Sequence, residues 1–167
     1  MTDTYDKAGL IALLRSEFRL DWHGVHGAPH WARVRHHGRY LARLRAADTL
    51  VVDLFALLHD SQRQNDFRDP LHGHRAAEFA AALNGRCFDL APRQLDWLTL
   101  AMTQHSDGHL STNATVQSCW DADRLDLGRV GIMPHPRLLS VPAAARIDYG
   151  HALSVQATAA RHYRMSR

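Results

Sequence analysis

The sequence is poor in cysteine and lysine and has no long apolar run, and each shortage argues against a class of protein. Its two cysteines, Cys87 and Cys119, lie far apart and outside any CxxC pair, which argues against a disulfide framework and a zinc–thiolate site. The most apolar stretch, Leu50–Leu58, contains Asp53 and is much shorter than the roughly 20 residues of a membrane-spanning helix. The N-terminal sequence MTDTYDKAGL has no basic segment before an apolar run, so we predict no secretory signal, a cytoplasmic location and no membrane partner.

What remains is a globular composition. The 167 residues are 46% hydrophobic and 22% charged, which predicts one domain, residues 1–167, with a core large enough to fold without disulfides. The net charge is +3 and the basic residues form no stripe, so we do not expect nucleic-acid binding. Lys7 is the one lysine, and arginine, which supplies the other fixed cations, is suited to paired contacts with phosphate.

Apolar residues recur at helical spacing, and nothing alternates with a period of two for long enough to indicate a sheet. We therefore predict an all-α fold, a bundle of six or seven helices. Asp48 or Thr49 can cap the most apolar of these helices. The predicted helices span residues 3–20, 29–46, 50–58, 71–84, 92–106, 113–126 and 142–163, with polar loops at 61–70 and 128–136.

Thirteen histidines are spread along the chain, and such a surplus raises the weight of a metal site or an acid–base site. Three segments place histidine or aspartate where chemistry is expected. In HWARV, His30 and Arg33 share a helical face with core residues, and in LLHD, His59 and Asp60 follow the most apolar helix. In DADRLD, Asp123 lies near a helix end. A buried carboxylate such as Asp60 needs a partner, and a metal ion, an arginine or a helix N-terminus would each supply one.

These three segments, in this order on three predicted helices, resemble the HD-domain superfamily of metal-dependent phosphohydrolases, and most closely its small stand-alone bacterial members. The resemblance covers residues 26–130 and implies a helical fold. It also implies that a divalent cation binds to four converging side chains, His30, His59, Asp60 and Asp123. Two imidazoles and two carboxylates suit Mn, Fe, Co, Ni, Zn or Mg, so the identity of the metal stays open. We expect one ion per chain rather than two.

Some members of the superfamily hold a second ion on two further histidines between the HD pair and the last aspartate. In this chain His74 and His105 lie in that interval, and their neighbours His72 and His109 could substitute for them. The alternative is that His74 and His105 bind substrate phosphate or relay protons.

The resemblance implies hydrolysis of a phosphate ester by a metal-activated water, with Asp60 as both ligand and orienting group. Arginines would neutralise the phosphate oxygens; we assign Arg33 and Arg63 to catalysis and Arg124 to substrate binding. The expected substrate is a small phosphorylated metabolite, above all a nucleotide. Two further carboxylates are candidates for fixing a ligand imidazole from outside the metal sphere, namely Asp126 and Glu78.

The chain departs from familiar relatives after the HD pair. Many continue HDIGK, whereas this sequence runs HDSQRQND and offers Arg63 in place of the lysine. A second interpretation is a di-iron oxygenase, which requires two irons with His74 and His105 as ligands. A third is a non-catalytic sensor of metal or nucleotide, whose acidic partner would meet the arginine face at Arg35, Arg39 and Arg43. The C-terminal helix carries no family motif, and we expect it to pack or to form the surface of a homodimer.

Overall fold

The computed structural model describes residues 5–165 of the chain. In this part we find eight α-helices, two short 3-10 helices and, in place of a sheet, a single bridge between Asn84 and Phe88. The all-α prediction is confirmed. The elements are α1 (Lys7–Glu17), α2 (Ala28–Arg45), α3 (Thr49–Leu58), α4 (His72–Leu83), α5 (Pro92–Gln104), α6 (Ala114–Arg124), η1 (Leu127–Val130), η2 (Pro136–Leu138), α7 (Val141–Ala144) and α8 (Ile147–Met165).

Short polar side chains account for where several helices begin. Asp6 accepts a hydrogen bond from the Gly9 N–H at 2.9 Å, so α1 begins later than the predicted helix 3–20, whose residues 3–4 lie outside the described part. Asp48 accepts from the Val51 N–H at 3.1 Å, which identifies it as the cap of α3. Each contact satisfies an N–H group that the first helical turn leaves without an intrahelical partner.

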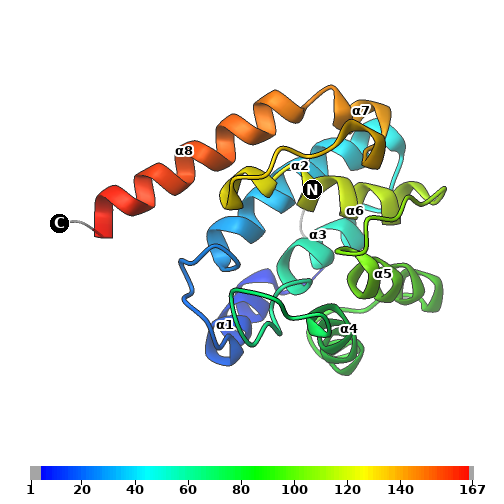
Figure 1. The fold of residues 1–167 in the computed structure, drawn as a ribbon. Helices are drawn as coiled ribbons and strands as arrows, with labels where there is room; N and C mark the ends of the chain where they lie inside the picture. The colour runs from blue at the N-terminus through cyan, green and yellow to red at the C-terminus, as the bar shows by residue number, and fades with distance from the viewer. Residues whose placement is uncertain (1–4, 166–167) are drawn as a thin grey trace.

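The C-terminal region differs from the prediction of one helix over 142–163. α7 is a single turn, and α8 begins only at Ile147. At the break, the guanidinium of Arg146 lies 3.8 Å from the centre of the Tyr40 ring and 4.5 Å from that of Tyr149. These cation–π contacts favour the bend between the two helices. Figure 1 shows α8 running out from the other helices, so that its C-terminal end projects from the molecule.

α3 is the central helix, as its sequence predicts. All of its residues from Val51 to Leu58 are buried, and it packs against α2, α5 and α6, which surround it in Figure 1. Gly38 on α2 permits the close approach of α2, because a Cβ at this position would lie 2.5 Å from a methyl group of Val52. The chain leaves α3 in the interior, and this places His59 and Asp60 in the middle of the molecule.

The structure also bears on membrane-spanning helices and on the two cysteines. Among the described helices, none is both long enough and apolar enough to cross a membrane. Cys119 is buried and Cys87 half-buried, and both are free thiols. Within the described residues, neither belongs to a group that could hold a metal ion.

Candidate metal centre

Three helices bring together the four residues that the resemblance singles out. His30 comes from α2, the adjacent His59 and Asp60 follow α3, and Asp123 lies in the last turn of α6. The His30 Nε2 lies 3.1 Å from the His59 Nε2, 3.4 Å from an Asp123 oxygen and 3.6 Å from an Asp60 oxygen. All four side chains are buried. The ligand atoms of His30, His59 and Asp60 lie within 4.8 Å of one another, close enough to bind a single cation.

The hydrogen bonds of the two rings determine which nitrogens face this centre. The Nδ1–H of His30 donates to Asp126 at 2.7 Å, and the Nδ1–H of His59 donates to the Phe55 carbonyl at 3.1 Å. In a neutral imidazole the other nitrogen then carries only a lone pair. Two lone pairs therefore face each other across 3.1 Å, beside an Asp123 oxygen that is buried and has no hydrogen-bond partner among the described residues. A cation between these atoms would satisfy all three.

A second pair of histidines repeats this pattern. His72 opens α4, His105 follows α5, and their Nε2 atoms lie 2.8 Å apart. Their Nδ1–H groups donate to the carbonyls of Asp69 and Met102. An Asp60 oxygen lies 3.2 Å from the His72 Nε2 and 3.8 Å from the His105 Nε2. The second pair thus brings two ring nitrogens and a carboxylate oxygen to one point, where the His72 Nε2 also accepts a hydrogen bond from the Arg63 guanidinium at 3.2 Å.

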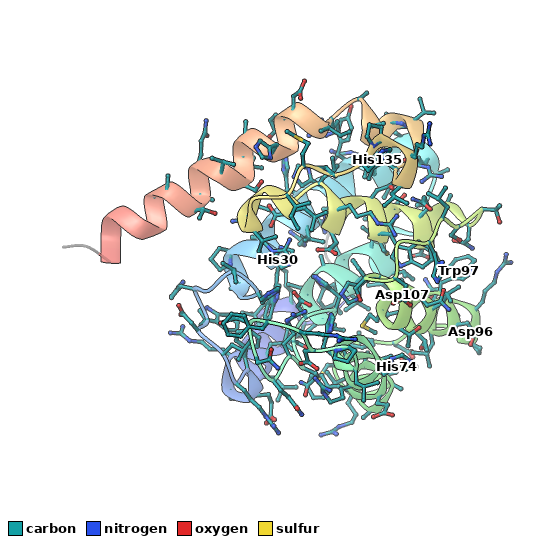
Figure 2. The ribbon with its side chains drawn as sticks, viewed as in Figure 1. His30, His74, Asp96, Trp97, Asp107 and His135 are labelled. Atoms are coloured by element: carbon teal, nitrogen blue, oxygen red, sulfur yellow. The ribbon has the colours of Figure 1, made fainter. Side chains whose placement is uncertain are left out.

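His74, which the sequence analysis placed at the site, lies outside this cluster. Its side chain is exposed on α4, and Figure 2 labels it well away from His30. Residues two apart on a helix point in different directions, so His72 alone of the two meets His105. Gly73 between them allows α4 to approach α5, because a Cβ there would lie 2.2 Å from the Met102 carbonyl oxygen. His109, the other substitute, is exposed.

Asp60 is shared by the two histidine pairs. Its Oδ2 faces His30 and His59, and its Oδ1 faces His72 and His105. In the described residues, the groups whose ligand atoms come together are His30–His59–Asp60, Asp60–His72–His105 and His59–His105–Asp123. A carboxylate with one oxygen at each pair can bridge two ions.

His26 is a buried contact of Asp60 to which the sequence alone assigned no role. Its Nδ1 lies 2.8 Å from the Asp60 Oδ2. The tight loop before α2 brings it there: the Ala28 N–H donates to the Trp22 carbonyl at 2.9 Å, and a Cβ at Gly27 would lie 2.2 Å from the same oxygen. The signal in the sequence is a histidine beside a glycine, four residues before His30.

The charge states of His30, His59 and Asp60 fit a cation site, whereas the pKa of His105 is shifted toward the protonated form. Burial lowers the pKa of His59 to about 4 and that of His30 well below its usual value. Burial alone would raise the pKa of Asp60, but the charge of His59 and hydrogen bonds from neighbouring histidines outweigh it and hold it well below its usual value. Burial opposes the protonation of His105, yet contacts with Asp60 and Asp123 raise its pKa. Neutral imidazoles and ionised carboxylates are the forms that bind metals.

Arg33 does not line the site, although the sequence analysis assigned it to catalysis. Its Nε and Nη2 donate to Asp126 at 2.6 and 2.9 Å. Asp126 in turn accepts the hydrogen bond from His30, as expected for a carboxylate that fixes a ligand imidazole. The structure therefore places Arg33 in a chain that positions His30. Glu78, the other candidate for this role, is exposed on α4.

A pocket of about 250 Å³ opens beside the cluster, and its wall is rich in arginine. Arg63, Arg124 and Arg129 are each less than 9% exposed. The first two are the arginines that the sequence assigns to a phosphate, whereas Arg129 lies in the predicted loop 128–136 and was not singled out. The lining residues are Asp60, Arg63, His72, His105, Ser106, Gly108, Asp123, Arg124, Leu127, Arg129 and Leu138.

Backbone carbonyls hold these arginines in place. Arg63 donates to the Phe67 carbonyl at 2.9 Å, and its Nη1 lies 3.4 Å from an Asp60 oxygen. Arg124 donates to the carbonyls of Leu138 and His109 at 2.6 and 2.7 Å. Arg129 donates to the Val25 carbonyl at 3.0 Å. Arg63 and Arg129 also pair with carboxylates of the cluster, Asp60 at 3.4 Å and Asp123 at 3.8 Å. The carbonyls orient the guanidinium of Arg124 without neutralising it.

The arginine face expected on α2 has a structural role for two of its members. Arg35 donates to Asp53 at 2.9 Å and Arg39 does so at 2.7 Å. Asp53 is a buried residue of the central helix. Asp53 therefore pairs with two of the three arginines that the sensor interpretation would present to an acidic partner. Arg43 remains exposed.

His37 is a further buried histidine, on α2 beneath α8. Neither of its ring nitrogens has a hydrogen-bond partner among the described residues. Burial lowers its pKa to about 4. The titratable and charged groups around it come from three parts of the chain: His36 and Arg33 on α2, Asp126 before η1, and Arg146 and Tyr149 at the start of α8.

Comparison with known proteins adds no relative. No family model, no curated protein and no solved structure matches the chain. The candidate site therefore stands on the geometry of this chain and on the three short segments that carry the resemblance.

Proposed function

We propose that the chain is a metal-dependent phosphohydrolase that holds two divalent cations and acts on a small phosphorylated metabolite. One observation carries the proposal: two histidine pairs meet at their Nε2 atoms, 3.1 and 2.8 Å apart, on either side of the Asp60 carboxylate. In the first pair both rings have lowered pKa values and engaged Nδ1–H groups, so these neutral rings cannot hydrogen-bond to each other through Nε2. Four imidazoles and two carboxylates suit Mn, Fe, Co, Ni, Zn or Mg.

The arginine-rich wall of the pocket favours a phosphate ester as substrate. Arg63, Arg124 and Arg129 can donate to phosphoryl oxygens and offset charge as it develops there. Bound divalent cations would supply an acidic water and polarise a phosphoryl oxygen. Asp60 has one carboxylate oxygen at each histidine pair and can orient the attacking water. The pocket, at about 250 Å³, is smaller than the roughly 300–1,000 Å³ typical for drug-sized ligands, so the base of a nucleotide would extend beyond it.

Metal content and phosphate release test this proposal together. Elemental analysis of untagged protein should find two ions per chain in the wild type and fewer in His72→Ala. His74→Ala is the matched control, because it removes an exposed histidine two residues away and should keep both ions. Released phosphate is then measured with Mn, Co, Ni, Mg or Fe on phosphate monoesters of increasing size, up to nucleoside monophosphates. Absence of bound metal after all of these additions would contradict the proposal.

A di-iron oxygenase is the second candidate, because the same four histidines and two aspartates suit a pair of irons. It predicts two irons per chain and substrate-dependent uptake of oxygen without release of phosphate. A non-catalytic sensor would bind the metals and turn over no substrate. Asp60→Asn shows whether a measured activity belongs to this centre or to a contaminating enzyme, because any activity of this centre should be lost in that variant.

A further inference from the structure

We propose that the groove along α2, on the side that faces α1, is a second ligand site, which binds a small ring-bearing carboxylate. The cavity measures about 580 Å³, more than twice the pocket at the metal centre. Its size lies within the range of about 300–1,000 Å³ that is typical of small-molecule sites. It shares no lining residue with the pocket at the metal centre. Its lining residues are Lys7, Ile11, Trp22, Ala28, Trp31, Ala32, Arg35, His36, Arg39, Tyr40, Arg43 and Leu57.

The floor of this groove is apolar and shaped for a flat ring. Trp22 and Trp31 meet edge to face with their ring centres 5.3 Å apart. Ala28 and Ala32, one helical turn apart, leave space above the surface of α2 because their side chains are small. A ring in this slot would contact two indoles and two methyl groups. Aromatic rings favour such offset or edge-to-face contacts.

The rim of the groove is positive. Lys7 is half-buried and Arg43 is exposed, and neither forms an ion pair with a described residue. Arg35 and Arg39 also line the groove, with their charges directed at Asp53. Four cations beside one buried carboxylate leave the groove suited to an anion. An apolar ring and a negative charge together describe an aromatic or alicyclic carboxylate.

Binding of 2-naphthoate to the full chain tests the proposal. Tryptophan fluorescence and calorimetry compare this ligand with 2-naphthamide, which has the same ring without the charge, and with acetate, which has the charge without the ring. We expect naphthoate to bind about tenfold more tightly than naphthamide and acetate to show no binding. Arg43→Ala, which removes a cation of the rim that pairs with no described residue, should weaken naphthoate several-fold. Arg93→Ala, which removes a cation beside Trp97 on α5, is the control and should leave binding unchanged.

A variant that fills the slot makes the test independent of these polar contacts. Ala32→Phe changes an exposed residue of α2 and should abolish binding while the protein stays folded. Equal affinity for naphthoate and naphthamide, or no binding of either, would overturn the proposal. So would sedimentation that shows a dimer broken by Ala32→Phe, which would assign the groove to a second copy of the chain. Metal content plays no part in these readouts, so they succeed or fail separately from the phosphohydrolase proposal.

Discussion

Replacement of Arg33 by methionine distinguishes a role in the fold from a role in chemistry. The Asp126 side chain is fully buried, and Arg33 gives it two of its hydrogen bonds, at 2.6 and 2.9 Å. Methionine keeps the length of the aliphatic stem but removes the cation, which leaves the carboxylate with the single bond from His30. Breaking a buried ion pair from one side costs about 3–5 kcal/mol. For a chain of this size that corresponds to a fall in melting temperature on the order of 10 °C.

Urea unfolding in the presence of EDTA measures this cost without a contribution from bound metal. Arg33→Met should lose about 3–5 kcal/mol of unfolding free energy. Asp126→Leu combined with Arg33→Met should cost less than the two single changes added together, because the double variant leaves no buried charge. Arg43→Met, an exposed arginine on the same helix, is the control and should stay within about 0.5 kcal/mol of wild type.

Wild-type stability of Arg33→Met together with loss of activity would contradict a structural role for Arg33. If Arg33→Met unfolds at the wild-type urea concentration and yet releases no phosphate, then the guanidinium acts on substrate. In that case the contact with Asp126 would not be its function, and the assignment of Arg33 to catalysis from the sequence would stand.

Three further predictions follow from single contacts. His26→Leu removes the donor to Asp60 and should weaken Mn²⁺ binding about tenfold or more, whereas His26→Asn keeps an N–H near that position and should restore it; equal titrations of the two variants would refute this role. Gly73→Ala forces a Cβ against α5 and should cost about 1–3 kcal/mol and one bound ion; both ions at wild-type stability would contradict it. His37 has a folded-state pKa of about 4 against the usual 6.5, so the unfolded chain binds more protons between these values and stability falls by about 3 kcal/mol as the pH drops from 6.5 to 4. His37→Phe should flatten this part of the profile, and an unchanged pH dependence of unfolding would show that His37 does not cause it.

Much of the helical framework could be predicted from the sequence, because helix formation depends on neighbours along the chain. The central helix is apolar on all sides, and α3 is buried as expected. Residues that cap helices act within three positions, and Asp48 does so at α3. The prediction was wrong where a distant contact decides the backbone. The bend between α7 and α8 lies where Arg146 meets Tyr40 on another helix.

The segment DADRLD shows how far the residues of the candidate site can be predicted from the sequence. Its three aspartates look alike in sequence, but each has a different environment. Asp121 accepts hydrogen bonds from Gln117 and from Ser140, which joins α6 to the start of α7. Asp123 faces the histidines, and Asp126 holds His30 and Arg33. Helical spacing separates these directions, but it does not say what lies in each of them.

Local spacing and composition specify most of the helices, the burial of α3 and the order of the three segments that carry the resemblance. The packing of the helices fixes that His72 rather than His74 meets His105, and that Asp60 is shared by two histidine pairs. It also assigned Arg33 to a buried carboxylate and brought Arg129 to the pocket. The physical reason is that a ligand set consists of atoms from separate helices. Their meeting depends on how closely those helices pack, which at α4 and α5 depends on the missing Cβ of Gly73.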